Sequence, residues 1–189
     1  FIDKGYKVSQ IGTKKISGLF GLHPLPDFLF NTQYSDVDKV YAFNRVMKDV
    51  SMQEKPDVIL LGIPDSLLPL NNKHRFSFGL YAYEIFNAVQ PDFVITSLIA
   101  NDGYNDEFYS EISKMAKYKY NVNIDAYFVS QFCPLSNSIW SEKLSYVYLS
   151  RMELPKTEYK VYTTSDLNND ILFKQAEKKL LLYGKYEQY

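Results

Sequence analysis

Apolar and polar residues follow one another in blocks along the chain, and the clearest block is Pro56–Pro69, PDVILLGIPDSLLP. A polar lead-in precedes a run of apolar residues, and Gly62 and two prolines then interrupt the pattern. This arrangement is typical of a strand that is buried on both faces and ends in a loop, so we expect a strand at Asp57–Ile63. Ligands of open α/β sheets collect where strands end, which places the expected working edge at Gly62–Arg75.

The rest of the pattern predicts further strands and helices in alternation. Apolar residues recur at helical spacing between Ser35 and Gln53, with Ser35 as the N-cap. The Pro-Asp lead-in recurs in PDFVITSLI, which predicts a second buried strand. Further strands are expected at 6–12, 123–129 and 159–162, and a short strand or helical turn at 144–149. Further helices are expected at 77–89, 104–118 and 164–182. Asn101 or Asn105 lies near the cap of the second of these helices, Ser165 or Asp166 can cap the third, and Gly184 ends it.

Strands and helices that alternate at this length indicate parallel strands joined by right-handed crossovers. We therefore predict an α/β protein, a three-layer sandwich with a mostly parallel sheet. A chain of 189 residues is long enough for one core and does not require two, so residues 1–189 are expected to form a single domain. The opening FIDKG is typical of the last turn of a helix that ends at Gly5, which indicates a fragment of a longer protein.

Composition narrows the class of protein. The formal net charge of -1 gives no overall attraction to nucleic acid or to anionic lipid, and no apolar run reaches the roughly 20 residues that cross a bilayer. We therefore expect no nucleic-acid and no membrane partner. A single cysteine rules out an internal disulfide and favours a cytoplasmic location. The 17 tyrosines and 13 phenylalanines indicate packing or a partner surface, so self-association remains open.

The candidate ligand-binding residues lie in the loops that follow the predicted strands. His74 with Lys73 and Arg75 forms a basic cluster that could receive a phosphate or a carboxylate, or could be a solvated loop. Gly62 opens the same loop, and Asp65 could bind a metal or cap the turn at 66–68.

A second group of candidates comes from the glycine-rich loop and the helix at 77–89. Lys14 and Lys15 could line an anion-binding groove, and His23 could act as a general base, a metal ligand or a packing residue. Glu84 is expected to be partly buried and paired with Arg75 or Lys73.

No catalytic residue and no metal site are identified from the sequence. Cys133 is expected to be an inert buried thiol, and two histidines that are far apart make a zinc site improbable. A Ser-His-Asp triad is compatible with the composition, but no GxSxG motif supports one.

The segment LGIPDSLLP resembles the dethiobiotin synthetase and cobyrinate-amidating branch of the P-loop NTPases, with Gly62 and Pro69 matching its glycine-rich turn and proline. The resemblance covers about the first half of the chain. It implies a P-loop NTPase-like, Rossmann-like fold without its N-terminal strand and phosphate loop. The cofactor is left unknown: a nucleotide with Mg²⁺ would suit this fold, but no phosphate loop in the chain supports it. Leu61 stands where that branch has its metal-binding acid, and no GxxxxGK[ST] occurs in the chain.

Most of the chain resembles a family of bacterial peptide maturation system proteins, which occur with radical-SAM enzymes and small modified peptides. The matching segments are GYKVSQIGTKK, LFGLHPLPDF, PDVILLGIP, and Phe78-Gly79-Leu80 with Ala82-Tyr83-Glu84 before AVQPD. The resemblance implies an accessory protein of ribosomal-peptide maturation that binds a peptide-modifying enzyme, a precursor peptide or an anionic ligand. The alternatives are an ATP-dependent ligase or kinase-like enzyme whose phosphate loop lies upstream of Phe1, and a domain that serves as a subunit interface.

Overall fold

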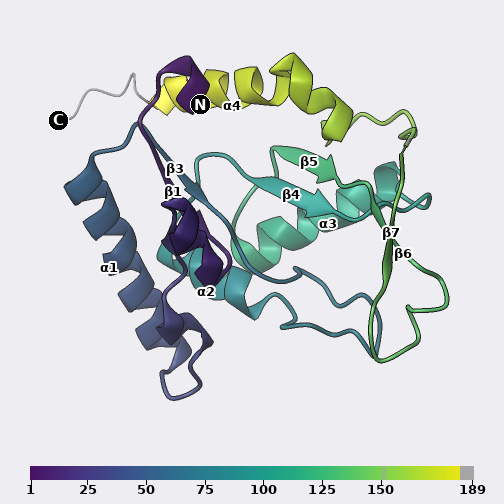
Figure 1. Ribbon diagram of the computed structural model, residues 1–189, viewed down its shortest axis with the longest axis horizontal. Coiled ribbons are helices and arrows are strands. Elements are labelled where there is room, and N and C mark those ends of the chain that lie inside the picture. The colour runs from purple at the N-terminus through teal and green to yellow at the C-terminus, as the bar shows by residue number, and fades with distance from the viewer. Residues whose placement is uncertain (151, 184–189) are drawn as a thin grey trace. The chain divides into compact units, whose positions relative to one another are not determined.

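The computed structural model describes residues 1–150 and 152–183, with the side chains of 167–169 left out (Figure 1). It is an α/β structure with open, mostly parallel sheets, as the alternating pattern predicts. The chain divides into two compact units, Phe1–Gln90 and Pro91–Tyr189, which we describe separately. The single-domain expectation stays a prediction. No helix within the described residues combines the length and apolar character that crossing a bilayer requires.

The first unit contains a three-stranded parallel sheet in the order β2-β1-β3. Two α-helices and three short 3-10 helices complete it. Their bounds are η1 Ile2–Lys4, β1 Val8–Gly12, η2 Lys15–Phe20, β2 His23–Pro24, η3 Asp27–Phe30, α1 Asp36–Glu54, β3 Val58–Leu61 and α2 Leu80–Ala88.

Residues at its two ends set the bounds of helix α1. The Ser35 hydroxyl accepts a hydrogen bond from the Asp38 backbone N–H at 3.2 Å, which confirms Ser35 as the N-cap. The helix ends at Lys55, which adopts the left-handed conformation with φ 48. Phe43 and Met47 of α1 pack against Ile85 of α2 and Ile11 of β1, and these side chains form the core of the first unit.

The prediction that the strand after Pro56 is buried on both faces is wrong. Ile59 and Leu61 pack against the core, whereas Leu60 is 41% exposed. Successive side chains of a strand point to opposite faces, and both α-helices of the first unit pack on the Ile59 side. Leu60 instead lines a shallow depression together with Val8, Gln10 and residues 1–3.

The second unit holds a parallel sheet in the order β4-β5-β8 and a separate antiparallel hairpin, β6-β7. Both α-helices of this unit follow a strand or a short 3-10 helix. The bounds are β4 Ile95–Leu98, α3 Asp106–Tyr120, β5 Ala126–Val129, β6 Phe132–Pro134, β7 Tyr146–Tyr148, β8 Val161–Thr163, η4 Thr164–Asn169 and α4 Ile171–Tyr183.

Two expectations for the second unit are refined. The segment at 144–149 contains a strand and not a helical turn. The closing helix is not continuous from 164, because a 3-10 helix ends at Asp170, whose left-handed backbone (φ 53) separates it from α4. The N-cap is Thr163 and not Ser165 or Asp166 as predicted; Asp166 instead completes the capping box, since its carboxylate accepts a bond from the Thr163 N–H at 2.7 Å. Gly184, the predicted stop, lies outside the described residues.

Tyrosines form much of the core of the second unit. Tyr109 and Tyr127 are 1% and 2% exposed, and their ring centroids lie 4.8 Å apart. The Tyr127 hydroxyl donates to the Tyr109 carbonyl at 3.1 Å and lies 2.7 Å from the Ser113 hydroxyl, so its polar atom is satisfied. Burial raises the pKa of nearby Tyr104 to about 12. Here the aromatic surplus serves packing.

One aspartate in each unit joins the amino ends of two parallel strands. The Asp57 carboxylate accepts from the Lys7 N–H at 2.8 Å, while the Asp57 N–H donates to the Lys7 carbonyl at 2.8 Å. Asp125 makes the same pair of bonds with Val94, both at 2.9 Å. Asp125 also binds α4, because Lys179 Nζ lies 2.7 Å from its other oxygen.

The core of the first unit can be tested at Phe43, which is fully buried. We expect Phe43→Ala to lower the free energy of unfolding by about 3–5 kcal/mol, because it removes buried apolar area and leaves a cavity. The matched control is Tyr41→Ala on the same helix, where the ring is 73% exposed and the cost should be about 0.5 kcal/mol or less. Urea denaturation measures both, and equal losses would contradict this assignment of the core.

Candidate functional site

The carboxyl end of the first sheet carries a row of three residues from three strands. Ile11 of β1 pairs with Leu61 of β3 on one side and with His23 of β2 on the other. Leu61 packs against the hydrophobic core. An apolar side chain, and not a carboxylate, therefore occupies this end of β3.

Gly62 lies directly beyond this row and allows the two following loops to approach closely. Its N–H donates to the Ile11 carbonyl at 2.9 Å. A Cβ atom at this position would lie 2.9 Å from the Thr13 methyl group and 3.3 Å from the Ile11 carbonyl oxygen. Glycine is therefore needed for contact between the loops that follow β1 and β3.

The two lysines of the first loop lie at the start of η2. Lys14 is its exposed N-cap residue, and its carbonyl accepts from the Ser17 N–H at 2.9 Å. Lys15 Nζ lies 2.8 Å from Asp27 Oδ1, and both side chains are largely exposed. This pair borders a wide, open depression of about 430 Å³, which is also lined by Phe30, Asn31 and Thr32. An exposed ion pair of this kind exchanges readily with a charged ligand.

Asp65 closes the loop that runs from β3 to α2. Its carboxylate accepts from the Ser77 N–H at 2.8 Å, twelve residues further on. Its backbone is left-handed, with φ 67. The structure thus corrects the expectation that Asp65 caps the turn at 66–68, because the capped N–H belongs to Ser77.

The basic cluster lies within the same loop, in a turn organised by Asn71. The Asn71 side-chain oxygen accepts from the N–H groups of Lys73 and His74 at 2.8 and 2.9 Å. The Arg75 side chain donates to the Asn72 carbonyl at 2.8 Å. His74 is half-buried, and its Nε2 has no hydrogen-bond partner among the described residues. Three adjacent basic residues are present, but part of the Arg75 donor capacity is used within the loop.

His23 takes part in a cluster that sequence reasoning missed. Its Nε2 lies 2.6 Å from Glu54 Oε1, and the buried Ser9 hydroxyl donates to the other oxygen of Glu54. The Lys7 ammonium donates to the Glu54 carbonyl. The hydrogen bond from Ser9, followed by that from His23, holds the pKa of Glu54 below its ordinary value of 4.5, although burial opposes the shift. No local signal predicts this cluster, because its members are 45 and 31 residues apart.

Serine and histidine both bond to the glutamate in this cluster and not to each other. A hydrolytic triad requires the histidine to contact the serine hydroxyl, so this hydrogen-bond arrangement does not activate Ser9 as a nucleophile. The arrangement instead attaches the end of α1 to β1 and β2.

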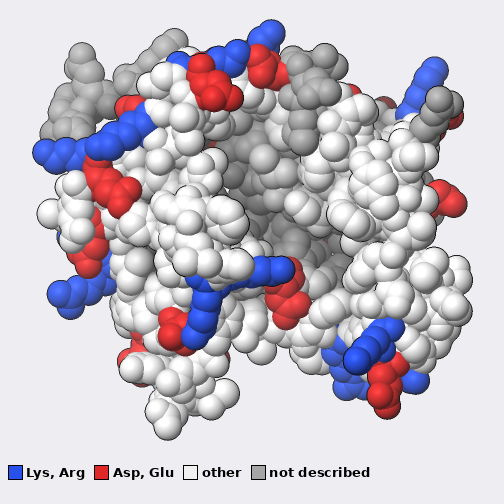
Figure 2. All heavy atoms as spheres, in the orientation of Figure 1, with Lys and Arg blue, Asp and Glu red and all other residues white. Residues whose placement is uncertain are grey.

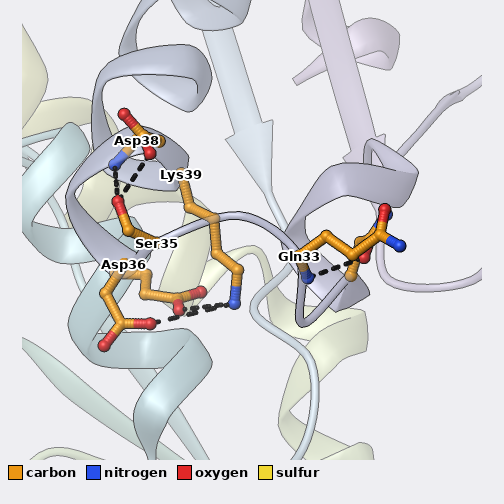
Figure 3. A network of polar contacts seen from close by, with 7 residues as sticks. Gln33, Ser35, Asp36, Asp38 and Lys39 are labelled. Carbon is orange, nitrogen blue, oxygen red and sulfur yellow. Dashed lines mark hydrogen bonds and ion pairs between the residues drawn. The ribbon is translucent and has the colours of Figure 1, made fainter.

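Glu84 is buried as expected, but the predicted partner is wrong. It is 4% exposed, and its Oε1 lies 3.1 Å from Nζ of Lys39, not beside Arg75 or Lys73. Figure 3 shows Lys39 reaching from the first turns of α1 alongside Asp36, whose carboxylate lies 3.9 Å from the same ammonium. Helix packing places Lys39 against Glu84 because α1 and α2 lie side by side in the first unit.

The remaining chemistry is limited. Among the described residues, no three His, Cys, Asp or Glu side chains gather in a way that could hold a metal ion. Cys133 is partly exposed and not buried as expected, because it lies in the thin β6-β7 hairpin. Acidic and basic side chains stand next to one another on the face drawn in Figure 2, between broad uncharged areas.

Comparison of the chain with protein-family models, with curated proteins and with solved structures gave no match.

The Glu54 cluster predicts a pH dependence of stability. A carboxylate whose pKa is lowered by folding contributes stability above its unfolded value of about 4.5, and this contribution is lost as the pH falls through the folded pKa. Glu54→Gln should therefore be less stable than the parent protein at neutral pH, and the difference should shrink below pH 4.5. Urea denaturation across this range measures it, with Glu153→Gln at an exposed position as the control. A pH-independent difference would contradict the assignment.

A structural role for Asp65 predicts a contrast between two replacements. Asp65→Ala should cost about 1–3 kcal/mol, because it loses the acceptor for Ser77 and places alanine in a left-handed conformation. Asp65→Asn should stay within about 0.5 kcal/mol, since asparagine retains an oxygen acceptor and tolerates φ > 0. The measurement is urea denaturation with and without Mg²⁺. A stabilisation by Mg²⁺ that Asp65→Asn removes would instead support a metal ligand.

Proposed function

We propose that this chain is an accessory protein of ribosomal-peptide maturation, which binds a precursor peptide or its modifying enzyme on a degenerate P-loop NTPase-like fold. The observation that carries the proposal is Leu61. An apolar residue that belongs to the core occupies the strand end where a metal-binding acid would be required. The parallel sheet and its loop-rich carboxyl edge support an ancestral nucleotide-binding arrangement.

The loop after β1 gives further support to a binding role. Only Thr13 and Lys14 separate β1 from the 3-10 helix η2, which is too short and too tightly wound to offer the row of free N–H groups that holds phosphates. Helix η2 exposes Leu19 and Phe20, and the partly exposed ring of Phe30 lines the open depression beside Lys15. Exposed aliphatic and aromatic side chains next to an exchangeable ion pair suit the side chains and charges of a peptide.

The proposal predicts binding without nucleotide turnover. The purified protein should release phosphate from MgATP no faster than a protein-free blank, and should co-purify with the radical-SAM enzyme or precursor peptide of the same gene cluster. Lys14→Ala combined with Lys15→Ala should weaken peptide binding about tenfold, since each exposed charged contact is worth about 0.7 kcal/mol and the two together about 1.4 kcal/mol. Fluorescence anisotropy with a labelled precursor peptide measures this effect.

The matched control is Lys117→Ala combined with Lys119→Ala, which removes two lysines from the end of α3 and should leave peptide binding unchanged. Mg²⁺-dependent ATP hydrolysis well above the blank would overturn the proposal and favour the ligase or kinase-like alternative. Absence of binding to both the enzyme and the peptide would remove the maturation role.

A further inference from the structure

The start of α1 and the middle of α2 share a small set of charges, two of which are buried. Lys39 and Glu84 are 9% and 4% exposed, and their charged atoms lie 3.1 Å apart. Asp36, which is largely exposed, lies 3.9 Å from the same ammonium (Figure 3). The single ammonium of Lys39 therefore interacts with two carboxylates, those of Glu84 and Asp36.

The second oxygen of Glu84 makes this set unusual. Glu84 Oε2 is buried and has no hydrogen-bond partner among the described residues. A buried carboxylate oxygen without a donor is unfavourable, and the single ammonium of Lys39 is already directed at Oε1. A proton on Glu84 removes one negative charge from the buried set and balances the remaining two charges.

The charges that act on Glu84 come from one neighbouring helix. Lys39 and Asp36 both belong to α1, while the first turn of α2 carries no acidic residue and its last turn no basic one. On either side of Glu84 along the core, Phe43 of α1, Ile85 and Ala88 are apolar. The protonation equilibrium of the Glu84 carboxyl group therefore depends on its burial, on Lys39 and on Asp36.

We propose that Glu84 binds a proton reversibly, and that Asp36, Lys39 and Glu84 form a pH-sensitive latch between the start of α1 and the middle of α2. This inference does not depend on the proposed function. Burial, as the largest cause, raises the pKa of Glu84 above 4.5; Lys39 opposes the shift and Asp36 adds to it. A raised acid pKa means that the contribution to stability is complete below pH 4.5 and is lost as the pH rises through the folded value.

The latch holds a segment whose backbone is otherwise unfavourable. Phe76, Phe78 and Gly79 directly precede α2, and all three are left-handed, with φ of 50, 54 and 75. Such conformations persist in non-glycine residues only when the surrounding structure holds them. The Asp65–Ser77 bond holds this segment on one side, and the latch holds it on the other. Ionisation of Glu84 should therefore loosen the start of α2.

The direct test is titration of the glutamate side-chain carboxyl carbons by NMR in the full chain. One resonance, assigned by its loss in Glu84→Gln, should titrate at a higher pH than the others. Asp36→Asn should shift its midpoint downward, because it removes the repelling carboxylate. Asp38→Asn is the matched control, since Asp38 lies in the same turn but bonds to Ser35, and it should leave the midpoint unchanged.

Titration of every glutamate in the ordinary range would overturn the proposal, and so would equal shifts in the two aspartate variants. Asp36 is exposed, so its variant keeps the test valid even if Glu84→Gln fails to fold. Amide hydrogen exchange gives the second readout. After correction for the pH dependence of the intrinsic exchange rate, protection of the Ala82–Ile85 amides should fall as Glu84 ionises. Protection that stays constant across the pH range of this ionisation would show that no latch exists.

Discussion

The structure depends on the register of its parallel strands, which two aspartates hold at the amino ends. Asp57 and Asp125 each accept a bond from the backbone N–H of the neighbouring strand and return one to its carbonyl. A slip of one residue would turn every side chain of a strand to the opposite face. With this register, Ile11 and Ile59 face the helices of the first unit, while Leu60 faces away. The same aspartate bond in the second unit aligns β4 with β5.

Register also decides which residues meet at the candidate site. It places Leu61, Ile11 and His23 in one row, and it brings Gly62 against the loop that follows β1. This row provides no carboxylate for Mg²⁺, because it consists of two apolar side chains and a histidine that bonds to Glu54. The loops beyond it present an exposed ion pair and exposed apolar side chains. The edge is thus better suited to contact with a chain of amino acids than to phosphate chemistry. This is the physical basis of the proposed function.

Features encoded by neighbouring residues were predictable from the sequence. Ser35 was predicted as an N-cap because a cap depends on residues within one turn, and Asn105, one of two candidates, caps α3 by the same geometry. Alternating blocks of apolar and polar residues likewise predicted the parallel α/β class. The very short strands β2 and β6 were not predicted, because two or three residues are too few to show a periodic pattern of apolar residues.

Features that join distant residues could not be predicted in this way. Glu84 was correctly expected to be buried, but its partner Lys39 is 45 positions away on another helix. The Ser9–Glu54–His23 cluster and the Asp65–Ser77 bond need the folded chain to bring their members together. The exposed face of β3 was missed because an apolar run alone does not show how many helices cover it.

The two aspartate bonds also bear on the order of folding. Asp57 and Lys7 are 50 residues apart, and Asp125 and Val94 are 31 apart, with a helix between the members of each pair. Loop closure over such distances costs chain entropy, whereas α1 and α3 are built from local contacts. Helix formation can therefore precede strand pairing in each unit. The two aspartate bonds would then form after the helices, when the strands of each sheet pair.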